Sequence, residues 1–188
     1  FGWQLDDILI LNSTDTLYSN NGFNASITPD NLVNETTIIG GNYRLREAAR
    51  GSGIATFNAL NGWAYRLSTD FVDVDSNFTE ANSQVGVSAH WATEASYDYF
   101  LNRHTRNSYD DLGCRILTYT SFGTDFVNAF WDGERMTFGD GDGTNYGPLV
   151  SLDVVGHEFS HGVTQYYADL IYANEPGALN ESFSDIFG

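Results

Sequence analysis

The sequence predicts an α+β fold in which a β-rich N-terminal part is followed by helices. Three observations predict this class. Short apolar or alternating runs fill the first 71 residues, an apolar stripe with helical spacing covers about residues 80–102, and a second such pattern covers residues 152–168. A chain of 188 residues that is 41% hydrophobic is long enough to bury a core of this kind.

The expected strands are short runs separated by clusters of Asn, Gly and Asp, which are turn-forming residues. In the first part of the chain they lie at residues 8–11, 38–39, 43–45 and 54–57, and we expect them to form a twisted antiparallel sheet. Later strands are expected at residues 115–119 and 128–131, with a turn at 139–143.

The first expected helix, near residues 80–102, has a broad apolar stripe that includes Trp91 and Tyr99. His90 and His104 belong to this region. Neither has a partner at the spacing of metal ligands, so we interpret both as packed or surface histidines.

The second expected helix, residues 152–168, is apolar along one side through Val154, Val155 and Phe159. After a turn at residues 175–177, a third helix is expected at 179–188. Apolar residues continue to its very end, so we expect it to be cut short and its partner to lie in the remainder of the same polypeptide. We therefore divide the chain into a β-rich lobe, residues 1–150, and a pair of helices, residues 151–188.

The net charge of the chain limits the classes of partner that it can bind. Asp and Glu number 25 against 8 basic residues, which gives a formal net charge of −17. Such a surface repels phosphates and anionic lipids, so we expect no nucleic acid and no membrane surface as partner. No run of eighteen apolar residues occurs, and we expect no membrane span.

The single Cys114 has no second cysteine with which to form an internal disulfide, and we interpret it as a small core residue. The chain begins at Phe1 and not at Met, so we also expect a processed start.

The stretch His157-Glu158-Phe159-Ser160-His161 carries the strongest chemical signal. Residues four apart on a helix lie on the same face, so His157 and His161 can present two imidazole nitrogens to one zinc ion. Glu158 borders the position where a zinc-bound water would lie, and is placed to act as a base.

A catalytic zinc ion needs a third protein ligand, and Glu181 on the next expected helix can supply a carboxylate. Asp185 lies one turn beyond Glu181. From there it can accept a hydrogen bond from the free ring nitrogen of a ligating histidine.

A second cation site is suggested by Asp73, Asp75 and Asn77, which place oxygen side chains on alternate residues as a Ca²⁺ loop does. Phe78 stands where the glycine of an EF-hand loop would be. A plain solvated turn is the alternative.

Several motifs together resemble the thermolysin family of secreted zinc endopeptidases. They are DVVGHEFSHGVT at residues 153–164, LIY at 170–172 and GALNESFSDIFG at 177–188, with further likeness at 43–54, 108–110, 128–131 and 138–142. The likeness covers about residues 43–188.

The resemblance implies that His157, His161 and Glu181 bind one catalytic Zn²⁺ ion, that Glu158 is the general base and that Asp185 orients His157. The other residues to which it gives roles serve the substrate or calcium. Tyr172 would stabilise the oxyanion, Asn128 and the backbone of Ala129 would hold the substrate as an added edge strand, and Tyr146, Leu149 and Val154 would line the pocket for the residue after the scissile bond. Asp73, Asp75 and Asn77 would belong to one structural Ca²⁺ site, and Asp153 to another whose remaining ligands lie beyond Gly188.

The implied activity is hydrolysis of internal peptide bonds in protein or peptide substrates, on the N-terminal side of bulky apolar residues, by a secreted, extracellular enzyme. Members of the family carry a second, helical lobe that supplies a histidine and an arginine to catalysis, and this sequence stops before it. The alternative is a non-catalytic zinc- and calcium-binding fragment or module. A third possibility is another class of zinc peptidase, such as an aminopeptidase.

Overall fold

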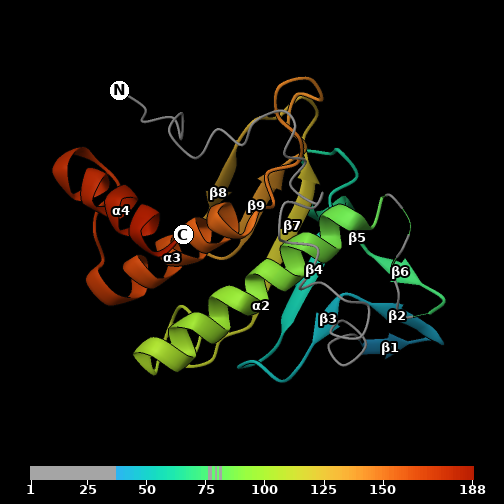
Figure 1. Cartoon of the computed structure of the whole chain (residues 1–188), viewed down its shortest axis with the longest axis horizontal. Coiled ribbons are helices and arrows are strands. Elements are labelled where there is room, and N and C mark those ends of the chain that lie inside the picture. Colours follow the sequence, from blue (N-terminus) through green and yellow to red (C-terminus); the bar gives the residue numbers. More distant parts are fainter. Residues whose placement is uncertain (1–36, 76–77, 79, 81) are drawn as a thin grey trace.

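The computed structural model describes residues 37–75, 78, 80 and 82–188. Within them lie nine strands, a 3-10 turn and three α-helices (Figure 1). The strands are β1 (Thr37–Ile39), β2 (Asn42–Arg44), β3 (Arg46–Glu47), β4 (Ile54–Asn58), β5 (Thr69–Asp70), β6 (Val72–Asp73), β7 (Ile116–Phe122), β8 (Ala129–Trp131) and β9 (Met136–Gly139). The turn η1 covers Tyr65–Leu67, and the helices are α2 (Gln84–His104), α3 (Leu152–Ala168) and α4 (Asn174–Phe187).

The strands form two sheets. A small antiparallel sheet has the order β1-β2-β6, and a larger sheet has the order β3-β4-β7-β9-β8, with β5 paired to β4. The larger sheet is mixed, because β4 pairs with β7 and β7 pairs with β9 in parallel. The strands expected in the first part of the chain pair antiparallel with one another, as β1 does with β2 and β3 with β4, but they are divided between the two sheets. A parallel pair needs a long crossover connection, and α2 supplies it between β4 and β7.

Helices α2 and α3 cover one face of the larger sheet, and α4 packs on α3 (Figure 1). Helix α2 contacts β4 and β7, α3 contacts β8 and β9, and α4 contacts α3 (Figure 1). Strand β7 alternates between buried and half-buried residues, as expected for a strand with one face against a core. The buried residues of α2, α3 and the sheet form one apolar cluster, which includes Ile54, Ile116, Phe138 and Phe159.

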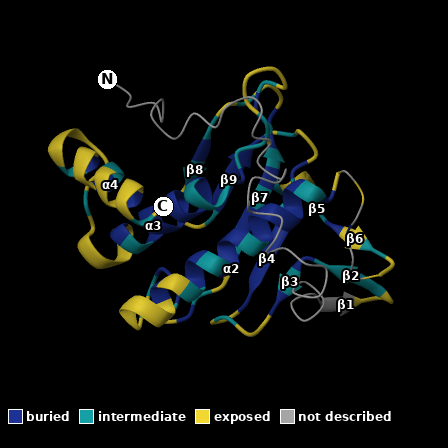
Figure 2. Cartoon of the chain, viewed as in Figure 1, coloured by how far each residue is buried: buried dark blue, intermediate teal, exposed yellow. Residues whose placement is uncertain are grey.

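Burial differs sharply between the last two helices. Helix α3 is buried along most of its length, whereas α4 is mostly exposed (Figure 2). Among the residues that the structure describes, no helix is long and apolar enough to cross a membrane.

The helix boundaries expected from the sequence agree with the structure for one of the last two helices and differ for the other. Helix α3 has the expected bounds, but α4 begins at Asn174, so the turn expected at 175–177 was wrong. Pro176 lies in the first turn of α4, where a backbone N–H has no partner within the helix, so proline is tolerated there. The expected strand at residues 8–11 lies outside the described residues.

Candidate metal centre and active site

Helix α3 begins after Ser151, whose backbone is extended, and ends at Asp169, whose backbone is left-handed. Its apolar side packs into the main cluster through Val154, Val155 and Phe159. The packing turns the opposite side of the helix, with its histidines, toward α4.

The two histidines of α3 lie one above the other with their ring centroids 4.6 Å apart. Both are buried, His157 to 2% exposure and His161 to 7%. Glu181 reaches them from α4: its Oε2 lies 3.2 Å from His157 Nε2, and its Oε1 lies 3.6 Å from His161 Nε2. One ligand atom from each of the three residues falls within 4.8 Å of the others. The structure therefore brings together the three residues that the sequence singled out as zinc ligands.

The far ring nitrogen of each histidine is held by a residue of α4. Asp185 Oδ1 lies 2.9 Å from Nδ1 of His157, as expected, although 61% of the Asp185 side chain is exposed. His161 Nδ1 lies 2.7 Å from Asn180 Oδ1 and 3.1 Å from Ser184 Oγ. Because an amide oxygen only accepts, Nδ1 of His161 carries the proton and Nε2 is free to bind a metal.

Asn180 and Ser184 were missed by the sequence reasoning. Both are buried, and they lie four residues apart, so they share one face of α4. A signal was present: polar residues at helical spacing beside an expected ligand, Glu181, are candidates to hold a ligand's ring.

Glu158 lies fully buried, at 0% exposure, next to the first histidine. Burial raises the pKa of this carboxyl to about 8, and the charge of Glu181 adds to the effect of burial, against a lowering by His157. The backbone N–H of Trp131 on β8 is near enough to lower the pKa somewhat. It does not make a hydrogen bond of ordinary geometry, since neither carboxyl oxygen has a partner among the described residues.

The histidines respond to their surroundings in opposite ways. Burial alone would lower the pKa of His157, but the carboxylates of Glu181, Glu158 and Asp185 together raise it above the ordinary value. Burial lowers the pKa of His161, and the charge of His157 lowers it further. In the low dielectric of the protein interior, the carboxylate of Glu181 strongly attracts a protonated imidazole, and a protonated His157 strongly repels a positive charge on His161.

This donor set fits a zinc ion. In the described part of the chain, His157 Nε2, Glu181 Oε1 and both oxygens of Glu158 are buried without a hydrogen-bond partner. Buried polar atoms are normally satisfied, and a cation bound by His157, His161 and Glu181 would satisfy His157 Nε2 and Glu181 Oε1, while a water on that cation would donate to Glu158. Two imidazoles and one carboxylate are also the ligands of a catalytic zinc site that keeps a position open for water.

The residues expected to serve the substrate include Tyr172, Asn128 and Ala129. Tyr172 follows α3, is 60% exposed, and places its ring 5.8 Å from that of His161. Asn128 immediately precedes β8 and Ala129 begins it, and β8 lies at one edge of the larger sheet. The indole N–H of Trp131 on this strand donates to Gln165 Oε1 of α3 at 2.7 Å, which links the edge strand to the helix of the histidines.

The three expected pocket residues differ in their surroundings. Leu149 and Val154 pack in the main apolar cluster. Tyr146 lies in the loop after β9, where its backbone N–H donates to Asp142, and its side chain is partly exposed.

The expected calcium ligands do not gather in a comparable way. Asp73 ends β6 and accepts the backbone N–H of Asp75, which is exposed, and Asn77 lies outside the described residues. Asp153 lies in the first turn of α3. Within the described ranges, only His157, His161 and Glu181 form a group of three such ligands.

A helix with the pattern His-Glu-x-x-His, packed against a helix that adds a third acidic ligand, defines the class of metallopeptidases. Comparison with known proteins makes the family specific. The family model "Thermolysin metallopeptidase, catalytic domain" matches residues 22–165, and "Thermolysin metallopeptidase, alpha-helical domain" matches residues 168–188. The chain belongs to the thermolysin metallopeptidase family.

Relatives with established names support this assignment. The chain is 45% identical over 152 residues to neutral protease NprE of Bacillus pumilus, an alignment that covers 79% of the chain and 51% of that protein. It is 44% identical over 149 residues to thermolysin of Bacillus sp. (strain EA1), covering 79% of the chain and 27% of that protein. The chain thus spans about half the length of NprE and about a quarter of the length of this thermolysin.

A solved structure agrees with the fold. The precursor of protealysin, a metalloproteinase from Serratia proteamaculans, superposes with a TM-score of 0.63 at 34% sequence identity, over 71% of this chain and 41% of that one. The α+β fold, with a β-rich lobe followed by the histidine-bearing helix of a thermolysin-like peptidase, is confirmed.

Proposed function

We propose that this chain carries the metal site and the catalytic base of a zinc-dependent endopeptidase. The observation that carries the proposal is the group of buried His157, buried His161 and half-buried Glu181 with Glu158 beside it, in a chain of this family. These three residues would hold the zinc ion. When bound, the ion supplies a Lewis acid that polarises the peptide carbonyl and acidifies a water molecule.

Glu158 takes the proton from the attacking water and passes it to the leaving amine. In the metal-free protein burial raises the pKa of Glu158 to about 8, and the positive charge of a bound zinc ion would lower it, so that the carboxylate is available to accept the proton. Asp185 and Asn180 hold the two imidazole rings in the tautomers that leave Nε2 available. No covalent intermediate is required.

Tyr172 donates a hydrogen bond to the oxyanion that develops on the substrate. Its position beyond the end of α3, with its ring near that of His161, supports this role. An exposed tyrosine can reach the substrate without losing a buried partner.

The substrate is a protein or peptide segment that pairs with strand β8 as an added strand. Strand β8 is an edge strand, and its last residue, Trp131, donates to Gln165 of the helix that bears the two histidines. A strand that is open along its length accepts the middle of a peptide as readily as its end, which favours internal cleavage. Leu149 and Val154, with Tyr146, would favour a bulky apolar residue after the scissile bond.

The remainder of the same polypeptide is the expected partner of the exposed side of α4. This side carries large apolar residues that are 43–67% exposed: Leu179, Phe183 and Ile186. Exposed apolar residues at helical spacing are normally covered by further protein. The family model of the helical domain matches this stretch of the chain, which supports the proposal.

We also propose structural calcium at Asp73, Asp75 and Asn77, and at Asp153, and action outside the cell. Partly exposed carboxylates bind calcium weakly, at the roughly 10⁻⁴–10⁻³ M concentrations found extracellularly. Detection of the processed enzyme in the culture medium tests the location.

The function is tested by zinc-dependent cleavage of an internally quenched peptide, with the 188-residue chain and with the longer polypeptide that contains it. The Glu158→Gln variant should bind zinc and lose at least about 10³-fold in kcat. Glu80→Gln, at an exposed glutamate, is the matched control and should leave kcat unchanged. Zinc binding with no cleavage by either polypeptide would instead favour the non-catalytic module, and release of single N-terminal residues would favour an aminopeptidase.

A further inference from the structure

Helix α4 contributes four residues to the metal centre, yet few of its large apolar side chains are buried. It supplies Glu181 as a ligand, and Asn180, Ser184 and Asp185 as supports of the two imidazoles. Its buried residues are Gly177, Asn180 and Ser184, none of which is a large apolar residue. Helices in proteins owe most of their stability to the packing of an apolar face, so something else must hold α4 in place.

Phe187 is the large apolar side chain of α4 that packs against the main core cluster. The others, Leu179, Phe183 and Ile186, are exposed. Phe187 follows Gly177, Asn180 and Ser184 at the spacing of one helical face, so it ends the buried stripe of the helix.

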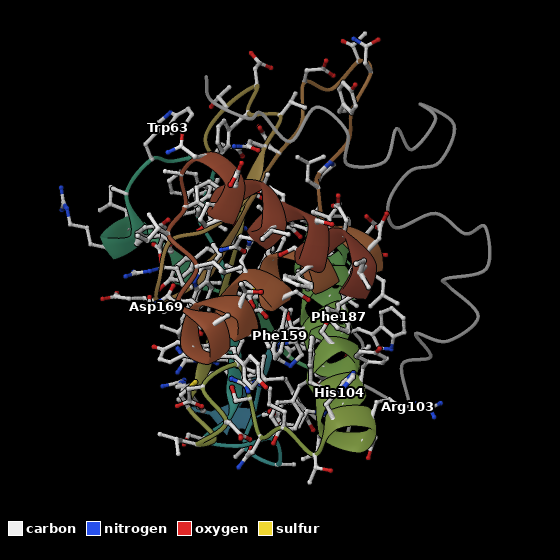
Figure 3. The ribbon with its side chains drawn as sticks, turned by 90° about the vertical axis from the view of Figure 1, so that its left-hand side faces the viewer. Trp63, Arg103, His104, Phe159, Asp169 and Phe187 are labelled. Carbon is white, nitrogen blue, oxygen red and sulfur yellow. The ribbon has the colours of Figure 1, made fainter. Side chains whose placement is uncertain are left out.

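The contacts of Phe187 join α4 to the two other helices. Its ring centroid lies 5.6 Å from that of Phe100 and 5.6 Å from that of His104, both on α2. Phe100 in turn stacks on Phe159 of α3, with centroids 5.4 Å apart. Figure 3 shows Phe187, Phe159 and His104 gathered where α4 and α3 meet α2.

The backbone next to Phe187 abuts the first histidine. A Cβ atom on Gly188 would lie 2.9 Å from the backbone nitrogen of His157, and a Cβ on Gly156 would lie 3.1 Å from the Cα of Gly188. The end of α4 is therefore seated directly on the turn of α3 that bears His157. A shift of Phe187 would move this contact and tilt the helix that carries Glu181.

We propose that Phe187 is a positioning residue of the metal centre. By packing on Phe100 and His104, it fixes the position of α4 and thereby holds Glu181 against His157 and His161. This inference rests on the proposed function, since it assigns Phe187 a role toward the zinc ligands. It has a structural reason: zinc requires its donors to lie within a few tenths of an ångström of their ideal distances, and a loosely held helix cannot meet that requirement.

The test is the zinc affinity of the 188-residue chain, measured by competition with a chromophoric chelator. Phe187→Ala should weaken zinc binding by about 10- to 100-fold, the range seen when the support of a metal ligand is lost. Ile186→Ala, at a neighbouring residue that is 67% exposed, is the matched control and should change the affinity by less than about twofold. Phe187→Leu, which keeps an apolar side chain, should restore most of the affinity.

A double-mutant cycle separates positioning of Glu181 from a general loss of stability. In a Glu181→Ala background the ligand is already gone, so Phe187→Ala should cost less than about threefold further. The d–d spectrum of bound Co²⁺ should change in Phe187→Ala and not in Ile186→Ala. Equal losses in both backgrounds, or a Phe187→Ala chain that binds zinc like the parent, would overturn the proposal. A parent chain that binds no zinc would overturn the proposed function, and the role of Phe187 with it.

Discussion

Glu158 should make the metal-free protein less stable at neutral pH, and the substitution Glu158→Gln should remove that cost. The side chain is fully buried, and burial raises its pKa from the ordinary 4.5 to about 8. In the unfolded chain the same carboxyl loses its proton near pH 4.5. Between these two values the folded state holds a proton that the unfolded state has released, so the free energy of unfolding falls as pH rises through this range.

The size of the effect follows from the pKa difference. From pH 4.5 to pH 7, at about 1.4 kcal/mol for each pH unit, the cost grows to about 3 kcal/mol. Glutamine has the shape of the protonated acid and does not titrate. We therefore expect Glu158→Gln to match the parent near pH 4.5 and to be more stable by about 3 kcal/mol at pH 7.

Urea unfolding of both proteins, with a chelator present, from pH 4.5 to pH 8 measures this difference. The comparison of variant with parent cancels the titrations of groups that do not interact with Glu158, whereas the titration of His157, whose pKa Glu158 helps to raise, contributes to the difference. Glu80→Gln should show no such pH-dependent gain, because Glu80 is exposed. A Glu158→Gln difference that stays flat across this pH range would refute the reasoning that burial holds the proton on Glu158.

Three further outcomes are expected. Zinc binding should weaken by about tenfold per pH unit below the raised pKa of His157, because the metal competes with a proton for the ring, and chelator competition from pH 5 to pH 8 would show it. Asn180→Ala removes the buried 2.7 Å partner of His161 and should weaken zinc binding by about tenfold. Gln165→Leu removes the acceptor of the Trp131 indole and should raise KM for long peptides by about fivefold, with zinc affinity unchanged. An unchanged KM would show that this bond does not support the edge strand.

The helix of the two histidines could be predicted from the sequence because one strong periodic pattern defines it. Its apolar residues recur at helical spacing and its bounds follow from them. The start of α4 could not be predicted in the same way. Glu175, Pro176 and Gly177 are typical of a turn, but the packing of α4 on α3 extends the helix over them.

The larger sheet was likewise predicted only in part. The buried run at β4 and the alternating run at β7 were predicted as strands. Their parallel pairing was not, because a register between strands separated by a helix is set by tertiary packing and leaves no local pattern. Strand β9 is four residues long and fully buried, and so short a run carries no periodicity.

Some residues of the candidate site could be predicted from their spacing in the sequence, and others depend on contacts between helices. Spacing within α3 indicated His157 and His161 as ligands, and spacing within α4 indicated Asp185 as a hydrogen-bond partner of a ligand. The bond from Asn180 to His161 joins two helices, so nothing in the local sequence of either helix specifies it. The same holds for Phe187, whose aromatic partners on α2 lie more than eighty residues away in the chain.

The most direct test of the account is to locate bound zinc by anomalous diffraction from crystals of the zinc-loaded protein. The account predicts one ion bound by Nε2 of His157 and of His161, at about 2.0–2.1 Å, and by a carboxylate oxygen of Glu181, at about 2.0–2.2 Å. Glu158 should lie beside the ion without binding it. An ion bound elsewhere, such as at Asp73 and Asp75, or one held directly by Glu158 in place of Glu181, would contradict the account.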